Sequence, residues 1–246
     1  MMYEIFNVER FKNYAVKFYA EFRSLRLQWI IMTGFWAAVM CISRGEVDFF
    51  TLTLFLFVFS IVSASRMSAF FTTRANKIRF LLTPASHFEK LLVMVLHHFL
   101  VIPVMYAVSL FIAQYCATLI TALFTLSVPH FTLPYAGIDI DTDLLGLFVL
   151  HYFNAVAFYL MGATIFTRHS FLKTTGVSMI VGFIFSILIM IAGTLHVLNT
   201  ATFEQLSDMS NMGGHFICVL SVIFTILFLI VAYMRLTEME VNETKK

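Results

Sequence analysis

Four polar side chains lie inside long apolar stretches, where ionisable groups are costly and are the first candidates for function. They are His97, His98, His151 and Asn154. Adjacent histidines point about 100° apart on a helix, which is a poor geometry for chelating a metal ion. His151 is expected near the opposite membrane face from the pair, so one ion does not reach all three. We therefore expect interhelical hydrogen bonds or placement at the membrane interface here, rather than a metal site or a proton relay.

A second pattern lies directly before the histidine pair. Ser86 and Glu89 have the Ser-x-x-Glu spacing of a capping box ahead of an apolar run. In such a box the Ser86 hydroxyl accepts from the Glu89 amide, and the Glu89 carboxylate accepts from the Ser86 amide. The pattern predicts that a membrane helix begins here.

Basic residues gather just upstream, at Arg74, Lys77 and Arg79, in a segment 74–82 that predicts a short helix. Such a loop is typical of the solvated, positively charged cytoplasmic side of a membrane protein. The sharper hypothesis is a docking surface for a cytosolic partner, made of these three residues with Ser86 and Glu89.

The composition explains why so few side chains are candidates for chemistry. The 246 residues are 60% hydrophobic and 12% charged, with a mean hydropathy of +0.89, whereas a soluble domain carries about 25% charged residues. This excludes a disordered chain, a disulfide scaffold and an ordinary cytosolic enzyme. The net charge of +2 is too small to indicate a nucleic-acid partner. Cys41, Cys116 and Cys218 lie in or beside apolar runs and are expected to be small buried hydrophobes.

The fold class that follows is an all-α membrane protein, because a helix needs about 20 apolar residues to cross a bilayer. Six spans are predicted, at residues 28–43, 49–65, 91–116, 144–166, 174–195 and 216–234. Together they form a single transmembrane domain over residues 1–246. Pro103 is the only mid-span proline and is expected to kink its helix.

The distribution of basic residues predicts the orientation. Fifteen of the 16 Lys and Arg residues fall in segments 1–28, 66–90, 167–173 and 235–246, and the opposite loops hold only Arg44. By the positive-inside rule these four segments and both termini are cytoplasmic.

An amphipathic helix is predicted over residues 3–27, ahead of the first span. Its apolar face is Phe11, Tyr14, Ala15, Phe18, Phe22 and Leu25. We expect this helix to lie in the cytoplasmic interface with its aromatic side chains in the acyl boundary. The alternative is a cytosolic helix packed on the protein itself.

Two outer loops carry local signals. The spaced aspartates at 139, 141 and 143 do not make an EF-hand, because Leu144 and Leu150 stand where Gly and Glu are needed. Asp143 or Thr142 is expected to cap the fourth span instead. A short helix is predicted at 201–210, ended by Gly213 and Gly214 before the last span.

The order of these elements resembles the permease subunits of ABC-2 type transporters. The string Leu-Thr-Pro-Ala-Ser-His-Phe-Glu-Lys at 82–90 is similar to the LPAS-x-x-EK stretch of small bacterial members of that family. The resemblance implies that the 74–82 segment contains a coupling helix that docks on a separate ATP-binding subunit. It also implies a second permease subunit, a multi-pass location in the bacterial cytoplasmic (inner) membrane, and outer re-entrant helices at 201–210.

The leading hypothesis is thus the membrane subunit of an ABC-type exporter, in contact with the lipid bilayer. No hydrolase or nucleotide-binding motif occurs in the chain, so it is not expected to be an enzyme or to hold a cofactor. ATP and Mg²⁺ would bind to the partner subunit. The alternatives are a non-transporting adaptor or assembly factor that recruits a partner through the basic loop, and an intramembrane enzyme built on His97, His98 and His151.

Overall fold

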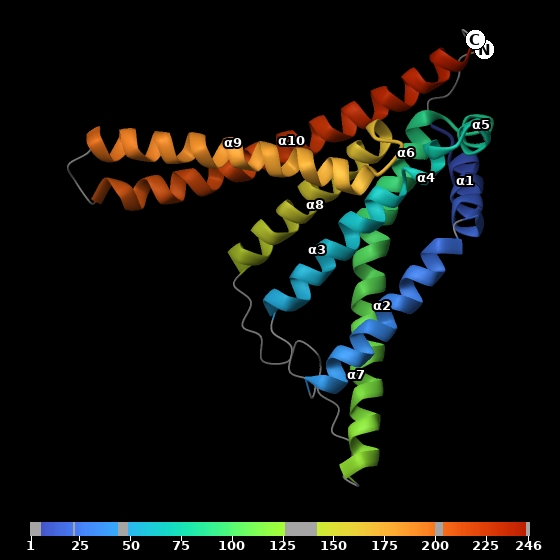
Figure 1. Cartoon of the computed structure of the whole chain (residues 1–246), viewed down its shortest axis with the longest axis horizontal. Coiled ribbons are helices and arrows are strands. Elements are labelled where there is room, and N and C mark those ends of the chain that lie inside the picture. Colours follow the sequence, from blue (N-terminus) through green and yellow to red (C-terminus); the bar gives the residue numbers. More distant parts are fainter. Residues whose placement is uncertain (1–5, 22, 44–48, 126–141, 200–203, 245–246) are drawn as a thin grey trace. The chain divides into compact units, whose positions relative to one another are not determined.

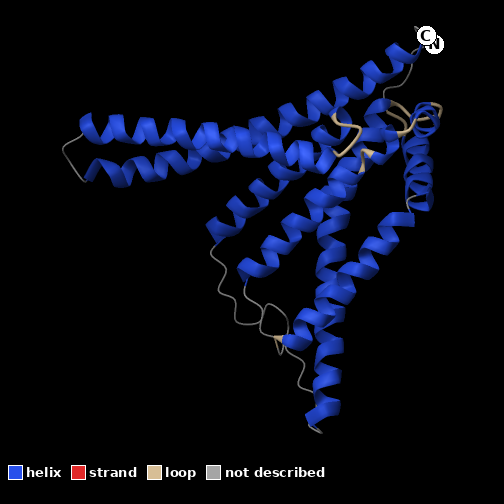
Figure 2. Cartoon of the chain, in the orientation of Figure 1, coloured by secondary structure: helices blue, strands red, loops and turns tan. Residues whose placement is uncertain are grey.

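The computed structural model describes residues 6–21, 23–43, 49–125, 142–199 and 204–244, and these segments are helical apart from short connections (Figure 2). No strand occurs in these ranges. The helices, in chain order, are α1 (Val8–Glu21), α2 (Arg23–Ile42), α3 (Phe49–Arg66), α4 (Ala69–Thr72), α5 (Arg74–Leu81), α6 (His87–Leu96), the π-helix η1 (His97–Val101), α7 (Ile102–Thr125), α8 (Thr142–Ile165), α9 (Ser170–Asn199) and α10 (Glu204–Thr244).

The chain divides into two compact units, a division that the sequence pattern did not predict. The first comprises residues 1–63 and 82–141, and the second comprises residues 64–81 and 142–246. Each unit therefore combines segments that are distant in the sequence.

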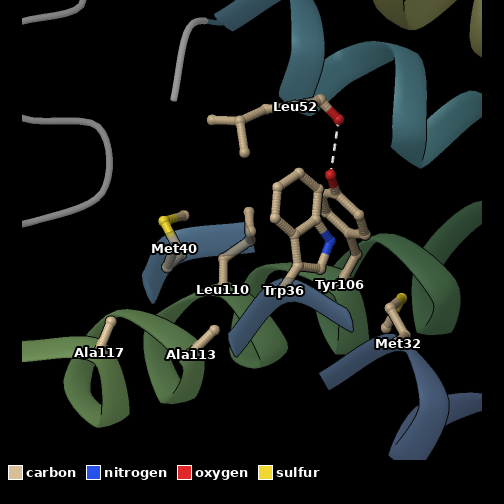
Figure 3. Close-up of a cluster of buried hydrophobic side chains, with 8 residues drawn as sticks. All are labelled: Met32, Trp36, Met40, Leu52, Tyr106, Leu110, Ala113 and Ala117. Atoms are coloured by element: carbon tan, nitrogen blue, oxygen red, sulfur yellow. Dashed lines mark hydrogen bonds between the residues drawn. The ribbon is translucent and has the colours of Figure 1, made fainter. Parts of the chain in front are cut away.

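In the first unit α2 and α7 lie side by side (Figure 1). Their contact is an apolar cluster of Met32, Trp36 and Met40 from α2 with Tyr106, Leu110, Ala113 and Ala117 from α7, joined by Leu52 of α3 (Figure 3). The Tyr106 hydroxyl donates to the Leu52 carbonyl at 2.6 Å. The Trp36 ring packs edge-on against Tyr106, with 5.7 Å between centroids. This aromatic core ties three predicted spans together.

In the second unit α8 packs against both α9 and α10. Gly162 of α8 faces Thr174 of α9, and a Cβ added at Gly162 would lie 2.7 Å from Thr174 Cγ2. Glycine is therefore needed at this helix crossing. Phe158 of α8 meets Phe228 of α10 with 5.1 Å between ring centroids.

Five helical stretches in the described part of the chain are long and apolar enough to cross a membrane. They are Phe50–Thr72, His87–Phe124, Leu145–Ile165, Ser170–Leu188 and Cys218–Met239. The chain is accordingly a multi-pass membrane protein. The first predicted span, 28–43, corresponds to a shorter apolar stretch, Leu27–Ile42. At 1.5 Å per residue this stretch is ~24 Å long, against a hydrocarbon core of about 30 Å.

Three other predictions concern the residues at which helices begin and end. The predicted 3–27 helix corresponds to α1 and to the first turn of α2, which begins at Arg23. The expected break at Gly213 and Gly214 is wrong, because α10 runs unbroken from Glu204 to Thr244. Each glycine costs a helix only about 1 kcal/mol, which a helix of this length tolerates. The aspartates at 139 and 141 lie outside the described residues, and Thr142 is the first residue of α8.

The irregularity expected at Pro103 lies one turn earlier, as the π-helix η1. Proline has no amide hydrogen to donate to the carbonyl four residues before it, and its ring clashes with that carbonyl. The chain widens its turn at this point, and the Ile102 amide donates to the carbonyl of His97, five residues back. Such π-bulges occur frequently at functional sites. Both histidines of the pair lie in η1.

Candidate functional site

The candidate site is built where α1 meets the start of α6, around the carboxylate of Glu89. Asn7 begins α1 as an N-cap, because its Oδ1 accepts from the amides of Glu9 at 3.0 Å and Arg10 at 3.2 Å. This cap turns the Asn7 amide and the Arg10 side chain toward α6. The first turn of α1 therefore has donors ready for an acidic partner.

Glu89 is that partner. Its Oε1 accepts from the Asn7 amide at 2.8 Å and from Arg10 Nη2 at 2.8 Å. Arg10 Nε lies 3.0 Å from Oε1 and 2.8 Å from Oε2. The side chain of Glu89 is 0% exposed, whereas that of Arg10 is 31% exposed. A buried carboxylate is tolerated because each of its oxygens has charged or backbone donors.

The same carboxylate completes the predicted capping box. Oε2 of Glu89 accepts from the Ser86 amide at 2.8 Å, and the Ser86 hydroxyl accepts from the Glu89 amide at 3.2 Å. The capping-box prediction is confirmed. Glu89 thus caps its own helix and fastens α1, two tasks of which the sequence pattern indicated only the first.

Further along α1, its inner face packs on the protein. Tyr14 and Phe18 are buried, and α1 contacts α6 and α2. Lys17 Nζ donates to Thr83 Oγ1 at 3.0 Å. The expectation that Tyr14 and Phe18 lie in the acyl boundary is therefore wrong, and the alternative, packing on the protein itself, describes them. An amphipathic pattern serves either surface, and the charged contacts to 83–89 decide between them.

The histidine pair lies under the end of α1. His97 is 1% exposed and His98 is 0% exposed, and their rings meet edge to face with centroids 4.9 Å apart. His98 Nδ1 lies 2.8 Å from the Met94 carbonyl. Because a carbonyl only accepts, His98 carries a proton on Nδ1. This bond lies within one helix.

His97 has a hydrogen-bond partner in α1. Its Nδ1 lies 3.3 Å from the hydroxyl of Tyr19 in α1. Burial raises the pKa of the Tyr19 phenol above its ordinary value, so the hydroxyl stays protonated and is available as a donor. The ring of Phe18 also packs edge-on against His97, at 5.8 Å.

The basic helix α5 belongs to the second unit, and its bounds confirm the predicted short helix. Arg74 and Arg79 are exposed and Lys77 is half-buried. The buried Phe80 anchors α5 on Phe71 of α4, with 5.1 Å between ring centroids. The structure thus assigns the five predicted docking residues to different units, since Ser86 and Glu89 belong to the first.

Polar contacts brace α4 and α5. Asn76 Nδ2 donates to the Ala69 carbonyl at 3.0 Å. Thr72 Oγ1 donates to the Thr167 carbonyl, in the turn between α8 and α9, at 2.9 Å. The short helices are therefore fixed to the end of a membrane helix pair within their own unit.

The two remaining candidates, His151 and Asn154, lie on α8. Asn154 Nδ2 donates to the Ser221 carbonyl of α10 at 3.1 Å, an interhelical bond of the expected kind. His151 is exposed. The histidine pair belongs to the first unit and these two residues to the second. Within the described ranges no group of three or more His, Cys, Asp or Glu side chains is placed to hold a metal ion.

The functional residues that sequence reasoning missed are Asn7, Arg10 and Tyr19. Each contacts a residue about 80 positions away, as in the Arg10–Glu89 pair. An available signal was Asn7, which stands two residues before Glu9 and three residues before Arg10. An Asn in this place is typical of an N-cap at the start of a helix.

No family model, curated protein or solved structure matches this chain.

Proposed function

We propose that this chain is the membrane-spanning permease subunit of an ABC-type export system, energised by a separate ATP-binding subunit and paired with a second permease subunit. The support is physical and comes from one feature of the second unit. A short helix with three cations, α5, lies outside the stretches that are apolar enough to cross a membrane, and it packs on α4 through the buried Phe80.

The packing of α5 on its neighbours favours a role in coupling to a cytosolic partner over the alternative, a solvated loop with a positive charge. A solvated positive loop needs no fixed conformation, yet α5 packs on α4 through the buried Phe80. Thr72 of α4 in turn donates to the Thr167 carbonyl in the α8–α9 turn. A push on α5 by a cytosolic partner would therefore pass through α4 to the turn between α8 and α9. Rigid elements of this kind are what carry a conformational change between two sites.

The first unit has a different part in the proposal. Glu89 and Ser86 are bonded within the chain, and Glu89 has no exposed surface for a partner. We assign them to holding α1 on α6. The partner-docking role then rests on Arg74, Lys77 and Arg79.

The experiment is affinity purification of the full chain from its own membrane, with measurement of ATP hydrolysis by the co-purified P-loop ATPase. Changing Arg74, Lys77 and Arg79 together to alanine should abolish the co-purification of the ATPase subunit and, with it, the measured ATP hydrolysis. A matched control removes three other cations, Lys12, Arg66 and Arg235. If the α5 triple variant retains its ATPase as the control does, the docking proposal is wrong.

The non-transporting adaptor predicts a different result. An adaptor also binds a cytosolic partner through its basic helix, but its outer segment does not respond to nucleotide. Co-purification of a partner without ATP hydrolysis would favour the adaptor.

A further inference from the structure

The turn between α8 and α9 lies at the surface of the membrane. The stretches Leu145–Ile165 and Ser170–Leu188 are both long and apolar enough to cross a bilayer, and only residues 166–169 separate them. A connection this short has no room to extend into the solvent. The side chains of the turn and of the start of α9 therefore lie at the level of the lipid headgroups.

Two permanent cations lie on this turn. Arg168 and Lys173 are both exposed, and Lys173 Nζ lies 5.8 Å from the centroid of the Phe166 ring, so the ammonium group lies back over the turn. Neither cation forms an ion pair among the described residues. Residues 144–203 and 64–81 contain no Asp or Glu, so neither α9 nor the neighbouring α4 and α5 can neutralise them. The positive charge is thus available to an anion from outside the chain.

Apolar side chains stand between the two cations. Phe171 is 36% exposed and Leu172 is 67% exposed. Leu172 begins a stripe of helical spacing that continues with Met179, Phe183 and Met190, each at least 64% exposed. Cations next to exposed apolar side chains at a membrane surface are typical of a segment that contacts both headgroups and acyl chains.

The conformation of the turn is fixed within the second unit. The Thr167 carbonyl accepts from Thr72 Oγ1 of α4 at 2.9 Å, and the His169 carbonyl accepts from the Lys173 amide at 3.1 Å. His169 has a φ of 54°, in the left-handed region that residues other than glycine adopt rarely. Strained positions of this kind cluster at binding sites and switch regions. The backbone that carries Arg168 is therefore ordered before any ligand binds, which lowers the entropic cost of binding.

We propose that the α8–α9 turn is a contact surface for anionic phospholipids, in which Arg168 and Lys173 attract the headgroups while Phe171 and Leu172 lie in the upper acyl region. Lys and Arg at the end of a membrane helix extend toward the interface and leave their apolar neighbours in hydrocarbon. The orientation predicted from the basic residues puts the turn in the cytoplasmic leaflet, where anionic lipids give the surface a negative potential. The surface uses none of the α5 cations assigned to partner docking, so the inference is independent of the proposed function.

The test is native mass spectrometry of the full chain with equal concentrations of phosphatidylglycerol, which is anionic, or phosphatidylcholine, which is zwitterionic. The unaltered chain should retain more phosphatidylglycerol, and equal retention of the two lipids would overturn the proposal. Arg168→Gln combined with Lys173→Gln should lower the retention of phosphatidylglycerol by about five-fold for each cation removed.

A matched control removes the same formal charge from two other exposed cations, through Lys12→Gln combined with Arg235→Gln. This control should bind phosphatidylglycerol as the unaltered chain does. An equal loss in the two double variants would mean that net charge alone attracts the lipid, which also overturns the proposal.

A second measurement does not depend on the folding of a variant. The unaltered chain is illuminated in nanodiscs of phosphatidylglycerol that carries a photoreactive diazirine beside the headgroup, and the cross-linked peptides are mapped. Cross-links within residues 166–173 support the proposal, and their absence from these residues contradicts it.

Discussion

Replacing Glu89 by glutamine is expected to release α1 from the start of α6. Glutamine retains one oxygen but places an NH₂ group where every neighbour is a donor: the amides of Ser86 and Asn7 and the guanidinium of Arg10. At least one buried donor then loses its acceptor, at a cost of about 1–3 kcal/mol. Loss of the ion pair adds about 1 kcal/mol, since Arg10 is 31% exposed and is screened by water. The docking of α1 should weaken by about 2–4 kcal/mol in total.

The assay is limited trypsin digestion of the full chain under native conditions, with cleavage followed at Lys12 and Lys17 of α1. When opening and closing are fast compared with cleavage, the cleavage rate follows the population of the open form. A change of 2 kcal/mol raises that population ~30-fold, at about 1.4 kcal/mol for each factor of ten.

A matched control is available in α10. Glu238 pairs with Arg235 at 2.6 Å, but both side chains are exposed. A surface pair of this kind contributes about 0–1 kcal/mol, so Glu238→Gln should leave cleavage of α1 unchanged. If Glu89→Gln is cleaved no faster than Glu238→Gln, the assignment of Glu89 as the anchor of α1 is refuted.

Two further substitutions test the helix contacts of the two units. Gly162→Ala should lower the thermal midpoint, because the added methyl group overlaps Thr174 and overpacking costs about 1–3 kcal/mol; Gly146→Ala in the same helix meets open space and should be neutral or stabilising. Equal midpoints for these two variants would contradict the close α8–α9 crossing. Tyr106→Phe should destabilise the chain by about 1 kcal/mol through loss of its bond to Leu52, and an unchanged midpoint in denaturant or thermal unfolding would show that this bond contributes nothing.

The parts of the site that could be predicted are those set by short-range chemistry. The capping box of Ser86 and Glu89 depends on a spacing of three residues, and α5 depends on an uninterrupted run without Pro or Gly. Both are visible in the sequence because a single turn of helix determines them. The apolar runs likewise predicted most of the spans, since bilayer thickness fixes their length.

The remaining parts depend on contacts between distant segments. The pattern of α1 is equally suited to lipid and to protein, and only the bonds from Arg10 and Lys17 to the 83–89 segment decide. The Tyr19–His97 contact is invisible in the sequence for the same reason. In α10 a local signal was misleading. The predicted break at Gly213 does not occur, because a long helix overrides the weak local preference of glycine against helix.

The most direct test of the proposed function is whether the 201–210 segment, which is predicted to lie on the outer side, responds to ATP in the proposed partner subunit. A single cysteine at Ser207→Cys, in a chain in which Cys41, Cys116 and Cys218 are replaced, can be labelled from outside in membranes that contain the full complex. A permease driven by ATP predicts a labelling rate that changes when ATP is added, and a change that is lost in the α5 triple variant. A labelling rate that is the same with and without ATP would contradict the account and would favour a non-transporting adaptor.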